Sequence, residues 1–234
     1  MNLAASAQFA LPFSVEQFYG VFVQYNESVW PMQIVLHAVA VATLALLVGA
    51  RPAGSRIIAG LLAFLWAWMA IAYYFVFFSR INASGWIIGA GLLAGGLWLG
   101  WVGGIEGRIR FGLGQGWRGA LGWMLIFYAL VAYPLIGYAV GHRYPAMPTF
   151  GLPCPVTIFT VGLLLTASPV PRSVYLAPAL WGLSGGASAT FLLGVYQDAG
   201  LLVAGIISLA AMLDTAANVG VPENETSTVG RRHL

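Results

Sequence analysis

No charged side chain lies between Arg56 and Arg80, and this run is long enough for a helix to cross a lipid bilayer. A helix needs about 20 consecutive, mainly apolar residues to span the hydrocarbon core. Apolar residues make up 60% of the chain and charged residues 7%, against about a quarter charged in soluble domains. The sequence therefore predicts an all-α membrane protein.

The apolar runs predict a seven-helix transmembrane bundle at residues 29–219, between an interfacial segment at 1–28 and a disordered cytoplasmic tail at 220–234. The predicted spans are residues 29–50, 57–79, 84–104, 119–141, 155–168, 174–195 and 200–219. The fifth is the weakest, because its apolar core of about 14 residues is shorter than a crossing helix needs. A re-entrant segment is the alternative there.

Residues 9–28 are predicted to form an amphipathic helix that lies at the membrane interface. A crossing helix would bury several polar side chains of this segment in hydrocarbon, which is costly. Ser14 and Gln17 have the spacing of a capping box, so the helix should begin just after Ser14. Its apolar face should consist of Phe18, Val21, Phe22 and Tyr25.

The distribution of the arginines predicts an N-out/C-in orientation. The chain has ten arginines and no lysine, and with seven crossings only Arg80 and Arg143 fall in outer loops. The inner loops and tail hold Arg51, Arg56, Arg108, Arg110, Arg118, Arg172, Arg231 and Arg232. Basic residues gather on the cytoplasmic side of membrane proteins, which fixes this direction.

Residues 148–158 form a proline-rich segment that opens the short fifth span. Interrupted backbone at membrane depth is tolerated only where protein or a water-filled cavity covers it, so we expect an outward-facing site here. Residues 9–18 and 150–159 also share the pattern Phe-x-Leu-Pro with a later Val and Phe. If this is an internal repeat, the N-terminal helix and the fifth span border the same cavity.

Two candidate site residues lie near the expected outer end. Cys154, the only cysteine, stands between two prolines at the start of a predicted helix, and either a reactive thiol or plain packing explains it. His37 lies in the outer half of the first span. An ionisable group inside a membrane is a functional candidate, although a hydrogen bond to a neighbouring helix explains it equally well.

The other candidate residues for ligand binding or transport are Asp214, Tyr133, Gln17 and Thr157. Asp214 is predicted to lie inside the seventh span and to carry a proton or cation on the inner path, with structural pairing to an arginine as the alternative. Tyr133, beside Pro134 at a predicted helix interruption, could line the cavity, as could Gln17 and Thr157. Asp198 is expected to be solvated at the end of a span.

Several function classes lack their defining residues. Without lysine the chain cannot form a retinal Schiff base, and one cysteine excludes an internal disulfide. Walker, nucleophile-elbow and zinc-protease motifs are missing. The net charge of +3 reflects loop arginines and does not indicate nucleic-acid binding. No catalytic or metal-ligating residue is predicted, and the identity of any cofactor is left open by the sequence.

Two phrases, FALPFSVEQFYGVFVQYNESVWP and PTFGLPCPVTIFTVGLLL, resemble an uncharacterised family of bacterial polytopic integral membrane proteins. The likeness runs from about residue 9 to about residue 219. It implies a multi-pass protein of the bacterial inner (plasma) membrane and no particular activity, so it transfers no catalytic or binding residue.

The leading hypothesis is an integral membrane transporter or channel for a small solute or ion. Its site would lie near residues 148–158. One alternative is a non-catalytic sensor or accessory subunit of a membrane complex; another is a membrane redox enzyme that uses Cys154 and His37. The expected partners are the lipid bilayer and a small solute or ion, and a homo-oligomer or larger complex is compatible with the short loops.

Overall fold

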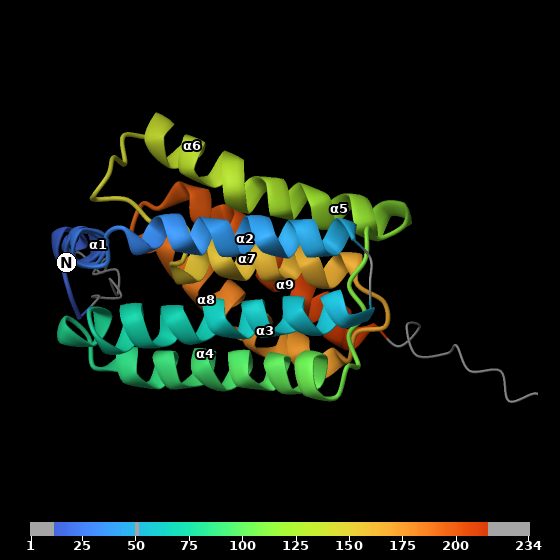
Figure 1. The fold of residues 1–234 in the computed structure, drawn as a ribbon. Helices are drawn as coiled ribbons and strands as arrows, with labels where there is room; N and C mark the ends of the chain where they lie inside the picture. The colour runs from blue at the N-terminus through green and yellow to red at the C-terminus, as the bar shows by residue number, and fades with distance from the viewer. Residues whose placement is uncertain (1–11, 50–51, 215–234) are drawn as a thin grey trace, which may run out of the picture.

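The computed structural model describes residues 12–49 and 52–214, and within these ranges the chain is helical with no β-strand. The predicted all-α architecture is therefore confirmed. The helices are α1 (Val15–Ser28), α2 (Met32–Val48), α3 (Pro52–Trp68), α4 (Ser84–Gly100), α5 (Gly116–Phe127), α6 (Tyr133–Ala139), α7 (Pro153–Thr166), α8 (Leu176–Leu192) and α9 (Ala199–Leu213). Figure 1 shows α2, α3, α4, α5 and α7 side by side, with α1 at one end. The predicted tail at 220–234 lies outside the described residues.

The predicted count of seven spans is wrong, because several of the helices are too short to cross a membrane. Among the described residues, four helical stretches are long and apolar enough to cross a membrane: Ala53–Arg80, Ser84–Ile105, Gly116–Ala139 and Tyr196–Leu213. A fifth is added if α1 and α2, which meet at an 85° bend, count as one broken span. At a rise of about 1.5 Å per residue, the 14 residues of α7 extend roughly 21 Å, which is less than a hydrocarbon core of about 30 Å.

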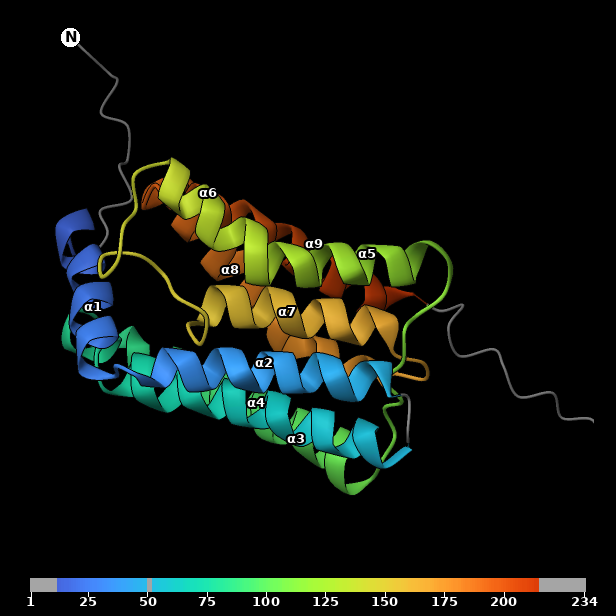
Figure 2. The same cartoon turned by 45° about the horizontal axis from the view of Figure 1, so that its top comes forward.

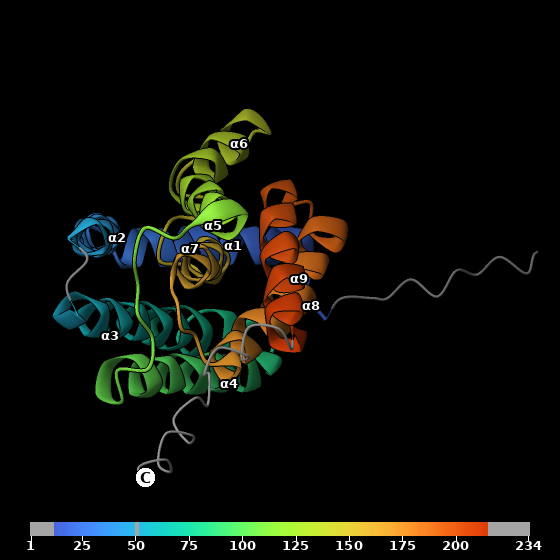
Figure 3. The ribbon, with the colours of Figure 1, turned by 90° about the vertical axis from the view of Figure 1, so that its right-hand side faces the viewer.

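The short helix α7 occupies the centre of the bundle. Viewed along the helix axes, it is surrounded by α2, α3, α5, α8 and α9 (Figure 3). Thirteen of its fourteen residues are buried, with Cys154 the half-exposed exception. A helix that is apolar on all sides is stable only inside such a core, so the apolar fifth segment is explained by burial in protein.

Helix α1 lies across one end of the bundle (Figure 2). The predicted capping box is present, with Gln17 N–H donating to Ser14 Oγ and Ser14 N–H donating to Gln17 Oε1. The predicted apolar face, Phe18, Val21, Phe22 and Tyr25, is buried. These side chains pack on the ends of other helices, since Phe22 and Tyr25 contact the ring of Tyr73. The face therefore covers the bundle.

Asn26 ties the loop between α6 and α7 to α1. Its side chain is fully buried, and its Nδ2 donates to the carbonyl oxygens of Pro145 at 2.7 Å and Met147 at 2.8 Å. Its Oδ1 accepts a hydrogen bond from Thr149 Oγ1 at 2.7 Å. One side chain thus supplies hydrogen-bond donors to two backbone carbonyl groups of an irregular loop. The loop enters the bundle without the regular backbone hydrogen bonds of a helix, so these carbonyl groups need another partner.

Glycines set the closest helix contacts. A Cβ atom added to Gly182 of α8 would lie 2.5 Å from the Cα atom of Gly205 of α9, so the two backbones touch. In α4, Gly89 and Gly96 contact aromatic side chains in the way expected of small interfacial residues. Gly91 differs, because no atom lies within 4 Å of an added Cβ there. Gly91 therefore faces open space.

Replacing Asn26 by Ala should lower the free energy of unfolding by about 1–3 kcal/mol, because the loop carbonyls lose their buried donor. The measurement is thermal unfolding in lipid nanodiscs, together with the rate of proteolysis within residues 140–152. Gln24→Ala is the matched control, since Gln24 is an exposed amide on the same helix. Equal unfolding midpoints and equal cleavage rates for the two variants would contradict the anchoring role of Asn26.

Candidate functional site

A cavity of about 230 Å³ lies at the end of the bundle that α1 covers, and we call it the Asp198 cavity. Its walls come from α1, from the stretch that continues α3, and from α4, α7 and α8. Aromatic rings dominate these walls: Phe13, Phe18, Phe22, Tyr73, Tyr74, Phe78 and Trp181. Two chemically distinct groups, the carboxyl group of Asp198 and the thiol of Cys154, also border the cavity.

Asp198 is the most unusual residue of the cavity, because its side chain is only 1% exposed. The Tyr133 hydroxyl group donates a hydrogen bond of 2.6 Å to Asp198 Oδ1, and the Cys154 thiol interacts with the same carboxyl group. Among the described residues, no basic side chain forms an ion pair with Asp198. A buried carboxylate without a cation is costly, so this group must bind a proton or a cation from outside the chain.

Irregular helix turns precede Tyr133 and carry two tyrosines of the cavity wall. Pro134 has no backbone N–H, and the helix before it widens into the π-helical turn η4 (Tyr128–Ala132), directly before Tyr133. A second π-helical segment, η1 (Met69–Phe75), carries Tyr73 and Tyr74 to the opposite wall. π-Helical turns are rare and often occur at functional sites.

A group of hydrogen-bonded side chains lies next to Asp198. The short 3₁₀ helix η6 (Tyr196–Asp198) places Gln197 within 3.4 Å of His142 Nδ1, while the Tyr19 hydroxyl group lies 2.9 Å from His142 Nε2. The Tyr128 hydroxyl group donates to the Gln197 carbonyl oxygen at 2.7 Å. These contacts fix the backbone of η6 and, through it, the position of Asp198.

A model of a family of unknown function, DUF6064, matches residues 15–221 of the 234 residues. The chain belongs to the DUF6064 family. The expected membership of an uncharacterised family is thereby confirmed. No curated protein and no solved structure matches the sequence. The matched range contains Asp198, Tyr133 and Cys154, so the polar cluster lies inside the DUF6064 region.

The structure brings together two of the six residues proposed from the sequence. Cys154 and Tyr133 meet at Asp198. Thr157 lies one helical turn beyond Cys154, fully buried, and its Oγ1 has no partner among the described residues. No group of three or more His, Cys, Asp and Glu side chains in this part of the chain could hold a metal ion.

The other three residues lie elsewhere. His37 is exposed on α2, where its Nδ1 lies 2.7 Å from the Gln33 carbonyl oxygen and its ring contacts Phe150. Gln17 is exposed and serves the cap of α1. Asp214 follows the last residue of α9 instead of lying inside a span, and its carbonyl oxygen accepts a hydrogen bond from Arg172. Arg172 lines a second, more polar cavity of about 780 Å³ together with Arg110 and Arg118.

Asp198 is the functional candidate that sequence reasoning missed. Its position between two apolar segments suggested a solvated turn, whereas η6 folds inward and buries it. One signal was available: Asp198 is the only charged residue between Arg172 and Asp214. A turn in water normally carries more charged residues, whereas a single acid in a long uncharged run is typical of a buried functional acid.

Replacing Tyr133 by Phe should lower the free energy of unfolding by about 1–3 kcal/mol, because it removes the short hydrogen bond to a buried carboxyl group. Thermal unfolding in nanodiscs measures the effect. Tyr138→Phe is the control, since Tyr138 lies on the same helix with its side chain exposed. If both variants unfold at the same temperature, Tyr133 does not support Asp198.

Proposed function

We propose that this DUF6064 protein is a membrane transporter that binds a small organic cation in the Asp198 cavity and exchanges it for protons. The observation that carries this proposal is the buried carboxyl group of Asp198, which has no basic partner among the described residues and borders a cavity. Such a carboxyl group is neutral when a proton occupies it and attractive to a cation when the proton leaves.

The cavity walls favour an organic cation over a metal ion. Aromatic faces attract cations through the ring quadrupole, and an alkylated ammonium group loses little hydration energy on entering an apolar site. A hard metal ion prefers several charged or carbonyl oxygen ligands, and the cavity offers one carboxyl group, the Asn82 amide and otherwise hydroxyl groups. Its volume of about 230 Å³ is below the roughly 300 Å³ at which drug-sized pockets begin, which favours a small charged head group.

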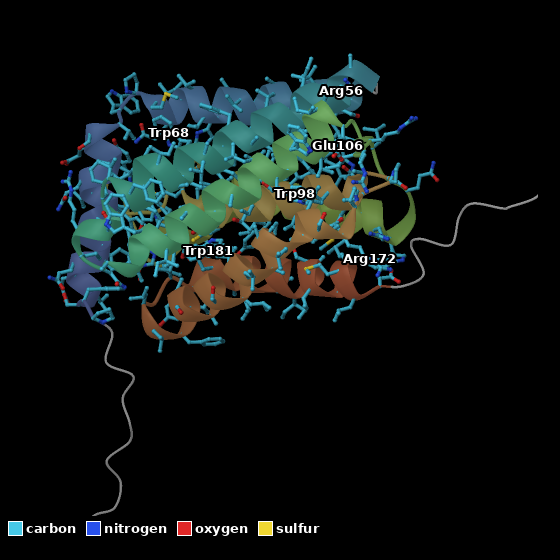
Figure 4. All side chains as sticks on the ribbon, turned by 90° about the horizontal axis from the view of Figure 1, so that it is seen from below. Arg56, Trp68, Trp98, Glu106, Arg172 and Trp181 are labelled. Carbon is cyan, nitrogen blue, oxygen red and sulfur yellow. The ribbon has the colours of Figure 1, made fainter. Side chains whose placement is uncertain are left out.

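The proposed orientation in the membrane rests on the different arginine content of the two ends of the bundle. Arg56 and Arg172 lie at the end away from α1, as Figure 4 shows. Arg108, Arg110 and Arg118 belong to the connection and first turn that join α4 to α5 at this same end. We assign this end to the cytoplasm of a bacterial cell and the Asp198 cavity to the outer half of its inner membrane.

The redox alternative has weaker support. It requires Cys154 and His37 to act together, yet their contacts differ: Cys154 interacts with Asp198 and Tyr133, whereas His37 contacts Gln33 and Phe150. A carboxyl group beside the thiol also opposes formation of a second negative charge, which nucleophilic thiol chemistry needs.

Binding of benzyltrimethylammonium to the protein in nanodiscs should release protons and tighten with rising pH, by up to about tenfold per pH unit while Asp198 carries the proton. Asp198→Asn should abolish both the proton release and the pH dependence. Isothermal titration calorimetry in buffers of different ionisation enthalpy measures both.

Glu27→Gln is the matched control, because it neutralises an exposed acid on α1. It should bind the probe and release protons as the unmodified protein does. Proton release that persists in a folded Asp198→Asn variant would overturn the exchange mechanism. A folded protein that does not bind the probe at any pH would overturn the organic-cation proposal.

A further inference from the structure

A second apolar cavity lies on the side of the bundle, between α4 and α8, and we call it the lateral groove. Its volume is about 470 Å³, and it is lined almost entirely by carbon atoms, with Ile87, Gly91, Trp98, Ala177 and Leu180 among its walls. Ile87 and Leu180 are exposed, so in a bilayer the groove opens toward lipid chains.

The lateral groove and the Asp198 cavity share three lining residues, Ile88, Trp181 and Ser184. The two spaces are therefore neighbours. Trp181 forms the boundary: its ring packs edge-on against Tyr74 at 5.6 Å, and an added Cβ at Gly185 would lie 2.6 Å from the indole. Glycine at position 185 therefore makes room for the indole at this boundary.

The indole Nε1 of Trp181 is buried and has no hydrogen-bond partner among the described residues. An unused N–H group at the boundary of two cavities can donate to an acceptor atom that lies between the head and the chain of a bound molecule, because an unpaired buried donor otherwise costs free energy. A quaternary ammonium head and an alkyl chain do not themselves accept this hydrogen bond. Trp181 lies nearer α1 than Trp98, which lines the groove (Figure 4).

We propose that the ligand is an amphipathic cation with an alkyl chain, which enters sideways from the outer leaflet through the lateral groove. This proposal deepens the proposed function and rests on it. The cationic head occupies the Asp198 cavity, and the chain remains in the groove between α4 and α8. An amphipathic cation dissolved in the outer leaflet already has its head near the interface and its chain toward the midplane, so it enters without turning over.

The test compares two probes, benzyltrimethylammonium and decyltrimethylammonium, on two glycine variants in nanodiscs. Gly91→Phe directs a ring into the groove, since Gly91 lines it and nothing lies within 4 Å of an added Cβ. Gly60→Phe is the matched control, since Gly60 is also exposed, helical and free of neighbours within 4 Å, and lies outside the groove. Both variants are measured in nanodiscs of the same lipid composition, so partition of the probes into lipid is the same in both and cancels in the comparison.

Gly91→Phe should weaken decyltrimethylammonium binding at least tenfold relative to Gly60→Phe and leave benzyltrimethylammonium binding unchanged. Equal affinities of the two variants for the decyl probe, with the short probe still bound, would overturn the lateral groove and leave the proposed function standing. If the unmodified protein binds neither probe, the cation site fails and the amphipathic-cation ligand fails with it.

A second measurement tests the entry path without relying on cation binding. Cys154 is the only thiol, and it adds to a maleimide by forming one S–C bond while its proton passes to the adjacent carbon. The neighbouring carboxyl group slows this addition, but it slows it equally in both variants, so the ratio of their rates reports access. N-decylmaleimide in the bilayer should label Cys154 about tenfold more slowly in Gly91→Phe than in Gly60→Phe. N-ethylmaleimide, which is small enough to arrive from the aqueous end, should label both variants alike. Equal N-decylmaleimide rates would overturn lateral entry.

Discussion

The bundle depends on a central helix that is too short to cross a membrane. Helix α7 is buried on all sides, and its fourteen residues extend over only part of the bundle length. The helix therefore begins inside the protein, at the turn that carries Cys154. The region between this turn and the end of the bundle contains the Asp198 cavity, the loop at residues 140–152 and helix α1.

A helix end inside an apolar interior must avoid unpaired backbone donors, and the proline pattern achieves this. The first four N–H groups of a helix lack partners within the helix. In α7 two of these positions are Pro153 and Pro155, which have no N–H group, and Val156 N–H donates to the Leu152 carbonyl oxygen. The prolines thus lower the cost of starting a helix inside the protein, because they remove backbone N–H groups that would have no partner. This explains why the proline-rich segment lies next to the cavity.

The sequence predicted what depends on local pattern and missed what depends on long-range packing. Apolar runs gave the helices, and the Ser14 and Gln17 spacing gave the start of α1. Pro148, Leu152, Pro153 and Cys154 of the proline-rich segment do line a cavity, and Tyr133 contacts Asp198 beside it, while the binding role expected for Cys154 and Tyr133 stays a prediction. Periodicity could not tell a short buried helix from a crossing one, because both are uniformly apolar. Three of the predicted spans became helices of 17 residues or fewer, α2, α7 and α8, and the span count failed for that reason.

The burial of Asp198 follows from contacts between residues more than 60 positions apart, such as the hydrogen bond from Tyr133 and that from Tyr128 to Gln197. No local pattern in Tyr196–Asp198 encodes them. The same reasoning shows why Asp214 was the more obvious candidate: it follows an apolar run directly, but that run ends at Leu213, where α9 ends. Position along a hydropathy profile therefore ranked the two acids in the wrong order of burial.

The electrostatic arrangement follows from these contacts. The end with α1 has one deeply buried acid and few arginines, whereas the other end gathers arginines around a polar cavity. A cation approaching the arginine-rich end meets repulsion, while one arriving near α1 meets aromatic rings and a carboxyl group. The Asp198 cavity lies beside the first turn of α7 and shares three lining residues with the lateral groove between α4 and α8. In the proposed mechanism, the short central helix thus leaves room for a charge that a ligand reaches from the bilayer as well as from the aqueous phase.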